Sequence, residues 1–172
     1  MKFSRIWAMP NPNTFTIPPI RDFVARHLHG VSVDPFARDC AVAKHTNDLN
    51  PATSAKHHMQ AVDFLKMLKE TGVKADTVLF DPPYSPRQIS ECYRAANLTV
   101  GMTDTQSSVL YKKARAAIRD ICAPGATVLQ FGWNSCGMGE GWEMEEILLV
   151  SHGGAHNDTI CTASRLINPR LL

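Results

Sequence analysis

The sequence lacks several motifs that would by themselves assign it to a class of proteins: paired cysteines, a membrane span and a signal peptide. Its five cysteines stand singly and include no CxxC pair, so neither a zinc ribbon nor a disulfide framework is indicated. No apolar run approaches the roughly 20 residues of a membrane span, and the N-terminus lacks the basic-then-apolar layout of a signal peptide. We therefore expect a soluble protein of the cytoplasm that has no membrane partner.

Phosphate-binding loops are missing too. Neither GxxxxGKS/T nor GxGxxG occurs, which argues against a nucleoside triphosphate or a dinucleotide as the ligand. The 18 basic and 16 acidic residues give a net charge of +2, too even for a protein that coats nucleic acid. One local basic cluster is most simply interpreted as the solvated face of a helix: Lys112, Lys113, Arg115 and Arg119.

What the chain does contain is an alternation of short strands and helices within one domain, residues 1–172. Its 172 residues with 44% hydrophobic content can bury roughly two thirds of the unfolded surface. Short β-branched or apolar runs predict strands, and apolar residues at helical spacing predict helices. The expected strands are 31–36, 41–46, 75–80, 127–133, 145–153 and 158–167. The expected helices are 20–30, two pieces within 52–72, 85–96 and 104–122.

This order of elements predicts an α/β fold, a mostly parallel sheet with helices on both faces. Only the HGGAHN loop joins the last two strands, which predicts an antiparallel C-terminal hairpin at one edge of the sheet. Prolines crowd the first 20 residues, so we expect an ordered arm or loop there. They are Pro10, Pro12, Pro18 and Pro19.

An acid follows three of the expected strands: Asp34, Asp48 and Asp81. Each could cap a helix, neutralise a cation or bind the two hydroxyls of a ribose. Because ligands of open parallel sheets bind outside the carboxyl ends of the strands, three acids in such positions favour a nucleoside-type cofactor. Without a phosphate loop, a cofactor that has a ribose but no phosphates fits best, and S-adenosylmethionine is the commonest such molecule.

The segment LFDPPYSPRQ, residues 79–88, carries a resemblance to a known family. Its tetrapeptide DPPY resembles the catalytic motif of the amino-methyltransferases, which move a methyl group from S-adenosylmethionine to the exocyclic amine of adenine or cytosine in DNA. In the residues of its motifs and in their order along the chain, the sequence is most similar to small adenine-specific DNA methylases of bacteriophages. The resemblance implies a Rossmann-like class I methyltransferase fold, DNA methylation at N6 of adenine, and a location in the host cytoplasm.

Further segments carry this resemblance over roughly residues 14–135 and the C-terminal hairpin. TIPPIRDFV resembles the segment that approaches the methionine end of the cofactor, and DPFAR resembles the first-strand motif DPFAG. TNDLNP places Asp48 where the family keeps its ribose-binding acid, and VDFL resembles the ADF element that contacts the adenine ring. The implied cofactor-binding residues are Thr16, Ile17, Pro18, Asp34, Pro35, Phe36, Asp48, Leu49, Asp63 and Phe64.

The DPPY tetrapeptide contains the groups that methylation of an aromatic amine requires. An aromatic amine is a poor nucleophile because its lone pair is delocalised into the ring. Asp81 and the backbone carbonyl of Pro82 would accept hydrogen bonds from the amine, with Pro83 fixing the turn. Tyr84 would stack on a base flipped out of the duplex, a contact worth ~1–3 kcal/mol per base. The expected catalytic residues are therefore Asp81, Pro82, Pro83 and Tyr84.

The target base would also meet residues near this motif. Ser85 follows the tetrapeptide directly, and Trp133 and Asn134 end the strand expected beside the catalytic one. We expect these residues and Tyr84 to bind substrate, although Trp133 could equally be packed under its loop.

Two features depart from the family pattern. The loop after the first cofactor strand reads Arg38, Asp39, Cys40, Ala41, with no glycine to let the backbone approach the cofactor closely. Almost nothing of the chain remains beyond the methyltransferase core, so we expect no separate target-recognition domain and a short or relaxed sequence specificity. The oligomeric state is expected to be a monomer or a homodimer.

Three other interpretations stay open. The motif recognises an amine on a planar ring and not a polymer, so RNA or a free or modified nucleobase could be the substrate. The chain could also be a catalytically lapsed, cofactor-binding interaction protein, which the missing glycines favour. His152, His156 and Asp158 could form a metal site, a turn that contacts substrate or a plain turn, and we expect no metal. Cys92 and Cys136 are expected to be buried or incidental thiols.

Overall fold

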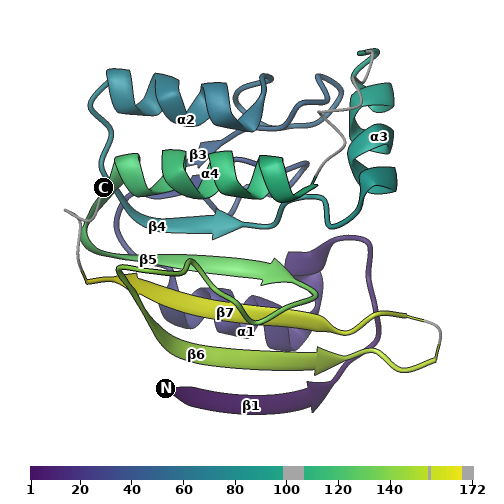
Figure 1. Cartoon of the computed structure of the whole chain (residues 1–172). Coiled ribbons are helices and arrows are strands. Elements are labelled where there is room, and N and C mark those ends of the chain that lie inside the picture. The colour runs from purple at the N-terminus through teal and green to yellow at the C-terminus, as the bar shows by residue number, and fades with distance from the viewer. Residues whose placement is uncertain (99–106, 155, 168–172) are drawn as a thin grey trace.

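The computed structural model describes residues 1–98, 107–154 and 156–167, and its strands form one seven-stranded sheet (Figure 1). The strand order is β1-β6-β7-β5-β4-β2-β3. The strands are β1 (Lys2–Trp7), β2 (Ser32–Asp34), β3 (His45–Thr46), β4 (Ala75–Phe80), β5 (Cys122–Gly132), β6 (Trp142–Ser151) and β7 (Thr159–Leu166). Among these strands, β7 runs antiparallel to both of its neighbours, and the remaining pairs are parallel. The predicted mostly parallel α/β sheet is confirmed.

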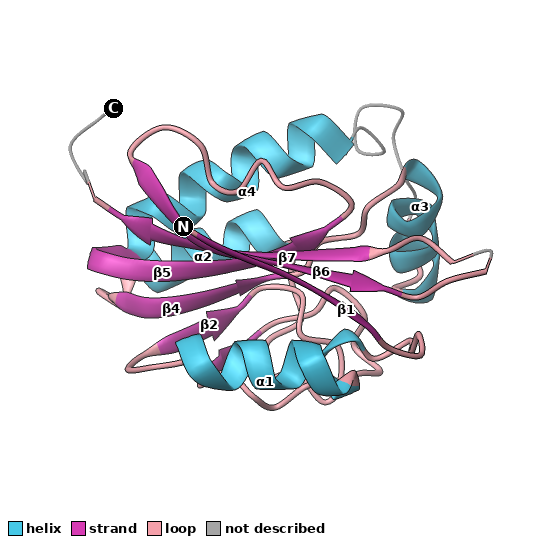
Figure 2. Cartoon of the chain, turned by 90° about the horizontal axis from the view of Figure 1, so that it is seen from below, coloured by secondary structure: helices cyan, strands magenta, loops and turns pink. Residues whose placement is uncertain are grey.

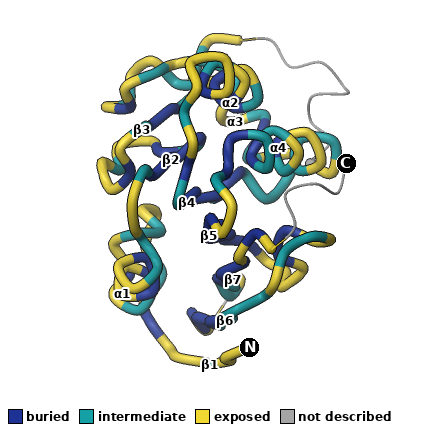
Figure 3. The backbone as a smooth tube through the Cα atoms, turned by 90° about the vertical axis from the view of Figure 1, so that its left-hand side faces the viewer, coloured by how far each residue is buried: buried dark blue, intermediate teal, exposed yellow. Residues whose placement is uncertain are grey.

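Helices cover both faces of the sheet (Figure 2). They are α1 (Pro18–His27), α2 (Ala61–Glu70), α3 (Pro86–Ala95) and α4 (Ser107–Ile121), with a short 3-10 turn η1 (Thr14–Thr16). On one face, α1 packs Ile20 and Phe23 against the β5 residue Phe131. On the other face, Phe64 of α2 and Ile118 of α4 pack over the central strands. The buried strands therefore lie between two helical layers (Figure 3), and α3 stands at their carboxyl ends (Figure 1).

The loop or arm predicted at the N-terminus is wrong for its first residues. Lys2–Trp7 form β1, which pairs in parallel with β6 at the edge of the sheet. All four prolines follow Trp7, so none of them removes a hydrogen-bond donor from this strand. The prolines do shape what comes next, because Pro18 opens α1 at the first helical position, where its missing N–H is not needed.

The predicted C-terminal hairpin is confirmed, but its place at the edge is not. β6 and β7 pair antiparallel from Trp142 and Leu166 to Val150 and Thr159. β7 also pairs with β5, so it is inserted between β5 and β6, and β1 forms that edge of the sheet. A short loop dictates that two strands pair, but it does not dictate which of them meets the rest of the sheet.

Of the two helical pieces predicted within residues 52–72, only α2 forms. The segment before it is a loop held by the buried side chain of Asn47, which donates to the carbonyls of Pro35 (3.1 Å) and Met59 (3.0 Å). His57, expected on a helix, instead forms an isolated parallel bridge with Asn47. The side-chain amide therefore replaces the helical hydrogen bonds that this segment would otherwise need.

The helix predicted at 104–122 is found as α4, and its first three residues lie outside the described part of the chain. Its basic cluster is only partly a solvated face. Lys112 and Lys113 are exposed, whereas Arg115 is half-buried and donates to the side-chain oxygen of Gln130 at 3.0 Å. Within the described residues, no helix is both long enough and apolar enough to cross a membrane.

Candidate active site

The segment Asp81–Tyr84 forms a fixed corner between β4 and α3. Phe80, the last residue of β4, is fully buried, and α3 begins at Pro86. The hydroxyl oxygen of Ser85 accepts from the backbone N–H of Gln88 at 3.3 Å and caps the helix. The side chain of Gln88 in turn accepts from the N–H of Tyr84 at 2.7 Å. Both neighbouring elements therefore hold the corner at the carboxyl end of the sheet.

Within this corner, the acid and the aromatic ring contact each other. The hydroxyl of Tyr84 donates a hydrogen bond to the carboxylate of Asp81. Burial raises the pKa of Asp81, while hydrogen bonds from Tyr84 and Thr14 and the charge of Arg38 act to lower it. Burial, followed by the nearby Asp81 charge, raises the pKa of Tyr84 well above its ordinary value. Tyr84 is therefore a neutral donor at physiological pH.

An aromatic surface extends this corner toward β5. The ring centroids of Tyr84 and Trp133 lie 5.5 Å apart at an interplanar angle of 53°. Trp133 is 46% exposed, so it is not packed under its loop. Asn134 is also exposed, and its side chain accepts from the backbone N–H of Cys136 at 3.1 Å. The residues expected to bind the target base thus lie at the ends of two adjacent strands.

Asp34 and Asp48 extend the acidic region beyond Asp81. Asp34 is fully buried at the end of β2; one carboxylate oxygen accepts from the N–H of Phe36 at 3.0 Å, and the other has no partner among the described residues. Burial raises its pKa well above the ordinary value, and the charges of Asp81 and Asp48 add to this effect. Asp48 accepts from the N–H groups of Asn50 (2.8 Å) and Arg38 (3.1 Å). Two of the predicted strand-end acids, Asp48 and Asp81, are therefore close enough to act on the third, Asp34.

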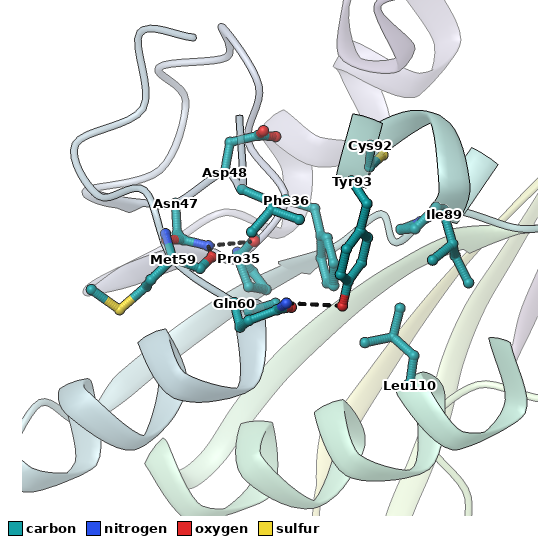
Figure 4. A pocket seen from close by; sticks show the side chains of 13 residues that line it. Pro35, Phe36, Asn47, Asp48, Met59, Gln60, Ile89, Cys92, Tyr93 and Leu110 are labelled. Atoms are coloured by element: carbon teal, nitrogen blue, oxygen red, sulfur yellow. Dashed lines mark hydrogen bonds between the residues drawn. The ribbon is translucent and has the colours of Figure 1, made fainter. Parts of the chain in front are cut away.

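A cavity lies beside Asp48 between the β2 and β3 loops and α3 (Figure 4). The cavity and the open space at its mouth together measure about 510 Å³. Gln60 and Tyr93 point toward one another across it, and the Gln60 amide donates to the Tyr93 hydroxyl at 2.8 Å (Figure 4). The remaining lining is largely apolar: Pro35, Phe36, Asn47, Leu49, Met59, Ala61, Pro83, Ile89, Cys92 and Leu110. Apolar walls with a few polar groups suit a planar ligand such as a nucleoside.

A second cavity of about 640 Å³, again including open space, lies between η1 and the loop after β2. Asp81 and Arg38 line it from two sides, and Thr14 and Thr16 line it from η1. Phe36 lines both cavities, so the two adjoin at this ring. The residues that line the second cavity are Asn13, Thr14, Phe15, Thr16, Phe36, Ala37, Arg38, Asp39, Cys40, Val42 and Asp81.

Four of the expected cofactor residues lie outside both cavities. Asp63 is exposed on α2 and pairs with Lys66 at 3.5 Å, but it lines a third, more open hollow that shares Gln60 and Tyr93 with the first cavity. Phe64 is fully buried in the core. Ile17 is buried under α1, and Pro18 begins that helix. The remaining six, Thr16, Asp34, Pro35, Phe36, Asp48 and Leu49, line a cavity or, in the case of Asp34, lie next to one.

Several polar residues at the site were not expected from the sequence: Thr14, Arg38, Asn47, Gln60 and Tyr93. Gln60 directly precedes α2, and this position between a strand and a helix is the one signal that could have identified it. Tyr93 is contributed by α3, far along the chain from the cofactor motifs, and nothing in the sequence connects it to them.

Two other expectations concern thiols and metals. Cys92 is exposed and lines the first cavity, and partial burial there raises the pKa of its thiol, so it is protonated and a poor nucleophile at neutral pH. The ring of His152 contacts the carbonyl of Ala8 and the hydroxyl of Thr159, each at 2.9 Å, and so anchors the turn between β6 and β7. Among the described residues, no group of three or more His, Cys, Asp or Glu side chains could hold a metal ion.

Comparison with solved structures shows that the chain has a Rossmann-like methyltransferase fold. It matches yhhF from Escherichia coli, provisionally assigned as a methyltransferase, with a TM-score of 0.53 and 13% identity over 93% of this chain and 92% of that one. It matches TrmN from Thermus thermophilus with a TM-score of 0.56 and 13% identity over 88% of this chain and 49% of TrmN. A provisionally assigned SAM-dependent methyltransferase from Streptococcus mutans gives a TM-score of 0.52 and 9% identity over 86% and 48%.

No model of a known protein family matches the chain, and no curated protein matches its sequence. The chain spans about half the length of TrmN and of the Streptococcus mutans protein. At such low identities the structural likeness establishes the fold, and the reaction has to be argued from the residues of the site.

Proposed function

We propose that this protein is an S-adenosylmethionine-dependent methyltransferase that methylates the exocyclic amine of adenine in DNA, with short or relaxed sequence specificity. One observation carries the proposal. The Asp81–Tyr84 corner lies at the carboxyl end of β4, where Asp81 lines the second cavity, Pro83 lines the first, and the Tyr84 hydroxyl contacts the Asp81 carboxylate. Open α/β sheets bind their ligands outside this end of the strands.

The charges at the site favour a cationic cofactor. The charges of Asp48 and Asp81 act on Asp34, and one buried oxygen of Asp34 has no hydrogen-bond partner among the described residues. Uncompensated buried carboxylates disfavour phosphates and favour a positive group. S-Adenosylmethionine carries a sulfonium and an ammonium but no phosphate, so the acids fit it. Its adenosyl part would occupy the cavity beside Asp48, with Gln60 and Asp48 as polar contacts.

The chain's own residues would position the amine. S-Adenosylmethionine supplies the methyl group. Asp81 and the carbonyl of Pro82 accept hydrogen bonds from the two amine hydrogens, which keeps the nitrogen lone pair out of the ring. Asp81 can then accept the proton that the amine loses after methyl transfer, because burial raises its pKa. Tyr84 and Trp133 offer aromatic surfaces to a base that has left its stack.

The choice of adenine in DNA rests on the sequence resemblance of the DPPY motif, since the same corner would accept an amine on RNA or on a free base. The test incubates the protein with radiolabelled S-adenosylmethionine and, separately, with duplex DNA, single-stranded DNA, RNA and nucleotides. We expect label in DNA, at adenine. Label in RNA or nucleotides alone would replace the DNA assignment. Absence of label everywhere, together with no cofactor binding by calorimetry, would overturn the proposal.

A second candidate, a cofactor-binding interaction protein without catalysis, has one observation in its favour. The hydroxyl of Tyr84 occupies the Asp81 carboxylate, the group that catalysis needs. Asp81→Ala separates the two candidates. The enzyme loses methyl transfer and keeps cofactor binding, whereas an interaction protein shows no methyl transfer even before the substitution. Asp22→Ala, which removes an exposed carboxylate on α1, is the matched control.

A further inference from the structure

Arg38 has an unusual backbone conformation for its residue type. Its φ is +51°, in the left-handed region that side chains rarely adopt, and Asn97 is the only other non-glycine described residue with a positive φ. Arg38 ends the DPFAR segment, at the position where the motif that this segment resembles has glycine. The chain thus keeps a glycine-like backbone while carrying a long cationic side chain. Strain of this kind is often retained where the side chain is used.

The Arg38 side chain is fixed at the wall of the second cavity. One guanidinium nitrogen donates to the carbonyl of Pro12 at 2.9 Å, which ties Arg38 to the segment before η1. Its backbone N–H donates to Asp48 at 3.1 Å, so the residue is also tied to the acid beside the first cavity. Its charge reaches Asp81 and acts to lower the pKa of that carboxyl group. A cation therefore lines the same cavity as Asp81 and acts on its carboxyl group.

The two cavities differ in chemistry. The first is largely apolar and suits a nucleoside. The second combines the Arg38 cation with the Asp81 carboxylate and the hydroxyls of Thr14 and Thr16. Because both cavities adjoin at Phe36, one ligand with a nucleoside at one end and an amino acid at the other can occupy them together. The Arg38 guanidinium of the second cavity matches the carboxylate of an amino acid, and the hydroxyl oxygens of Thr14 and Thr16 can accept hydrogen bonds from its ammonium.

We infer that Arg38 binds the α-carboxylate of the methionine part of S-adenosylmethionine. The inference rests on the proposed function, since it deepens the cofactor assignment. A guanidinium and a carboxylate form strong, charge-assisted hydrogen bonds. Without glycines in this loop, the backbone approaches the cofactor less closely. The arginine side chain provides a contact that compensates for this.

The test compares two ligands by calorimetry. S-Adenosylhomocysteine has the amino-acid carboxylate, and 5′-methylthioadenosine has the same nucleoside and thioether without it. Arg38→Gly should weaken binding of S-adenosylhomocysteine about 10- to 100-fold, the effect of losing a hydrogen bond to a charged group. Binding of 5′-methylthioadenosine should change less than about twofold, a small free-energy difference. Glycine suits the positive φ, so this variant should fold, which a melting curve checks.

Two further variants sharpen the comparison. Arg38→Lys keeps the charge but loses the planar fork, so its affinity for S-adenosylhomocysteine should fall between those of the wild type and Arg38→Gly. Arg87→Ala removes an exposed arginine of α3 that pairs with Glu91, and it should bind both ligands like the wild type.

The outcomes distinguish this inference from the proposed function. Equal binding of S-adenosylhomocysteine by the wild type and Arg38→Gly would overturn the role of Arg38 and leave the function standing. Equal weakening of both ligands would show that Arg38 only shapes the loop. Weakened binding of an oligonucleotide, with cofactor binding unchanged, would assign the arginine to a substrate phosphate instead. Failure of the wild type to bind either ligand would remove both the inference and the proposed function.

Discussion

Tyr84 donates its hydroxyl hydrogen to the carboxylate of Asp81, three residues earlier on the corner between β4 and α3. The two groups that the proposed reaction needs are therefore engaged with each other. In the proposed reaction, an amine that approaches Asp81 displaces the tyrosine hydroxyl, and the tyrosine ring stacks on the base. The contact couples the ionisation of the acid to the position of the ring, and substitutions at Tyr84 can separate the two effects.

Tyr84→Phe should shift the acid limb of the pH–activity profile to higher pH. Burial raises the pKa of Asp81, and the Tyr84 hydrogen bond opposes this increase. Without the hydroxyl, the pKa rises further, so the carboxylate becomes protonated at a higher pH as the solution is acidified. Activity that depends on the ionised Asp81 carboxylate is then lost at a higher pH than in the wild type. Single-turnover rates across the acid range measure the shift, and an unchanged acid limb would contradict the coupling.

Tyr84→Ala should weaken substrate binding as well. Removal of the ring eliminates a stacking contact worth about 1–3 kcal/mol, which corresponds to an increase in KM of roughly 5- to 150-fold. Tyr84→Phe keeps the ring and should show little of this increase. The ratio of KM values for the two variants therefore measures stacking alone. If Tyr84→Phe raised KM as much as Tyr84→Ala, the hydroxyl and not the ring would hold the base.

Asp34→Asn should stabilise the free protein at neutral pH. Burial raises the folded-state pKa of Asp34, so the folded protein disfavours the ionised carboxyl group. The contribution of Asp34 to the free energy of unfolding is therefore present below the unfolded pKa and is lost as the pH rises through the folded pKa. Asparagine keeps an oxygen for the N–H of Phe36 and carries no charge. Each 1 kcal/mol gained would raise Tm by about 2–4 °C in a chain of this size.

Melting curves at several pH values should show the advantage of Asp34→Asn shrinking toward acid pH. Asp22→Asn, an exposed carboxylate on α1, should show no such trend. The same Asp34 variant should bind S-adenosylmethionine more weakly, because the cation loses one of its compensating carboxylates. A variant that is both less stable and equally tight for the cofactor would refute this account of Asp34.

The alternation of strands and helices could be predicted because β4, β5 and β7 are apolar runs and α1 and α4 have helical spacing. The edge strand β1 could not, since most of its residues are exposed and its short KFSRIW sequence has no buried face. Hydrophobic patterns identify strands through burial, so an exposed edge strand gives little signal.

The candidate site likewise contains residues that the sequence predicts and residues that it does not. Asp34, Asp48 and Asp81 could be predicted because strand ends are visible in the sequence. The motif that contains Asp63 predicts a contact with the cofactor, but Asp63 lies in the first turn of α2, is exposed and pairs with Lys66 beside an open hollow that adjoins the first cavity. The glycine-like conformation of Arg38 depends on contacts with Pro12 and Asp48, which are distant in sequence. Such tertiary contacts leave no local pattern.

Glu146 should stabilise the fold in a pH-dependent way. It is a buried carboxylate of β6 that contacts Lys2 of β1 and both Arg26 and His27 of α1, at 3.3, 2.9 and 3.0 Å. Burial acts to raise its pKa, but the hydrogen bond from His27, the charge of Arg26 and the contact with Lys2 outweigh this and lower it. Its stabilising effect is therefore present above the unfolded pKa and is lost as the pH falls through the folded pKa.

Glu146→Gln should accordingly lower the free energy of unfolding at neutral pH by about 1–3 kcal/mol, the range for hydrogen bonds to a charged group. The loss should disappear in acid, where the wild-type carboxyl group is protonated as well. Glu143→Gln on the same strand, where an exposed pair with Arg165 is broken, should cost less than about 1 kcal/mol. Urea unfolding at neutral and acid pH measures all three proteins. A loss that persisted in acid would mean that Glu146 contributes through packing and not through its charge.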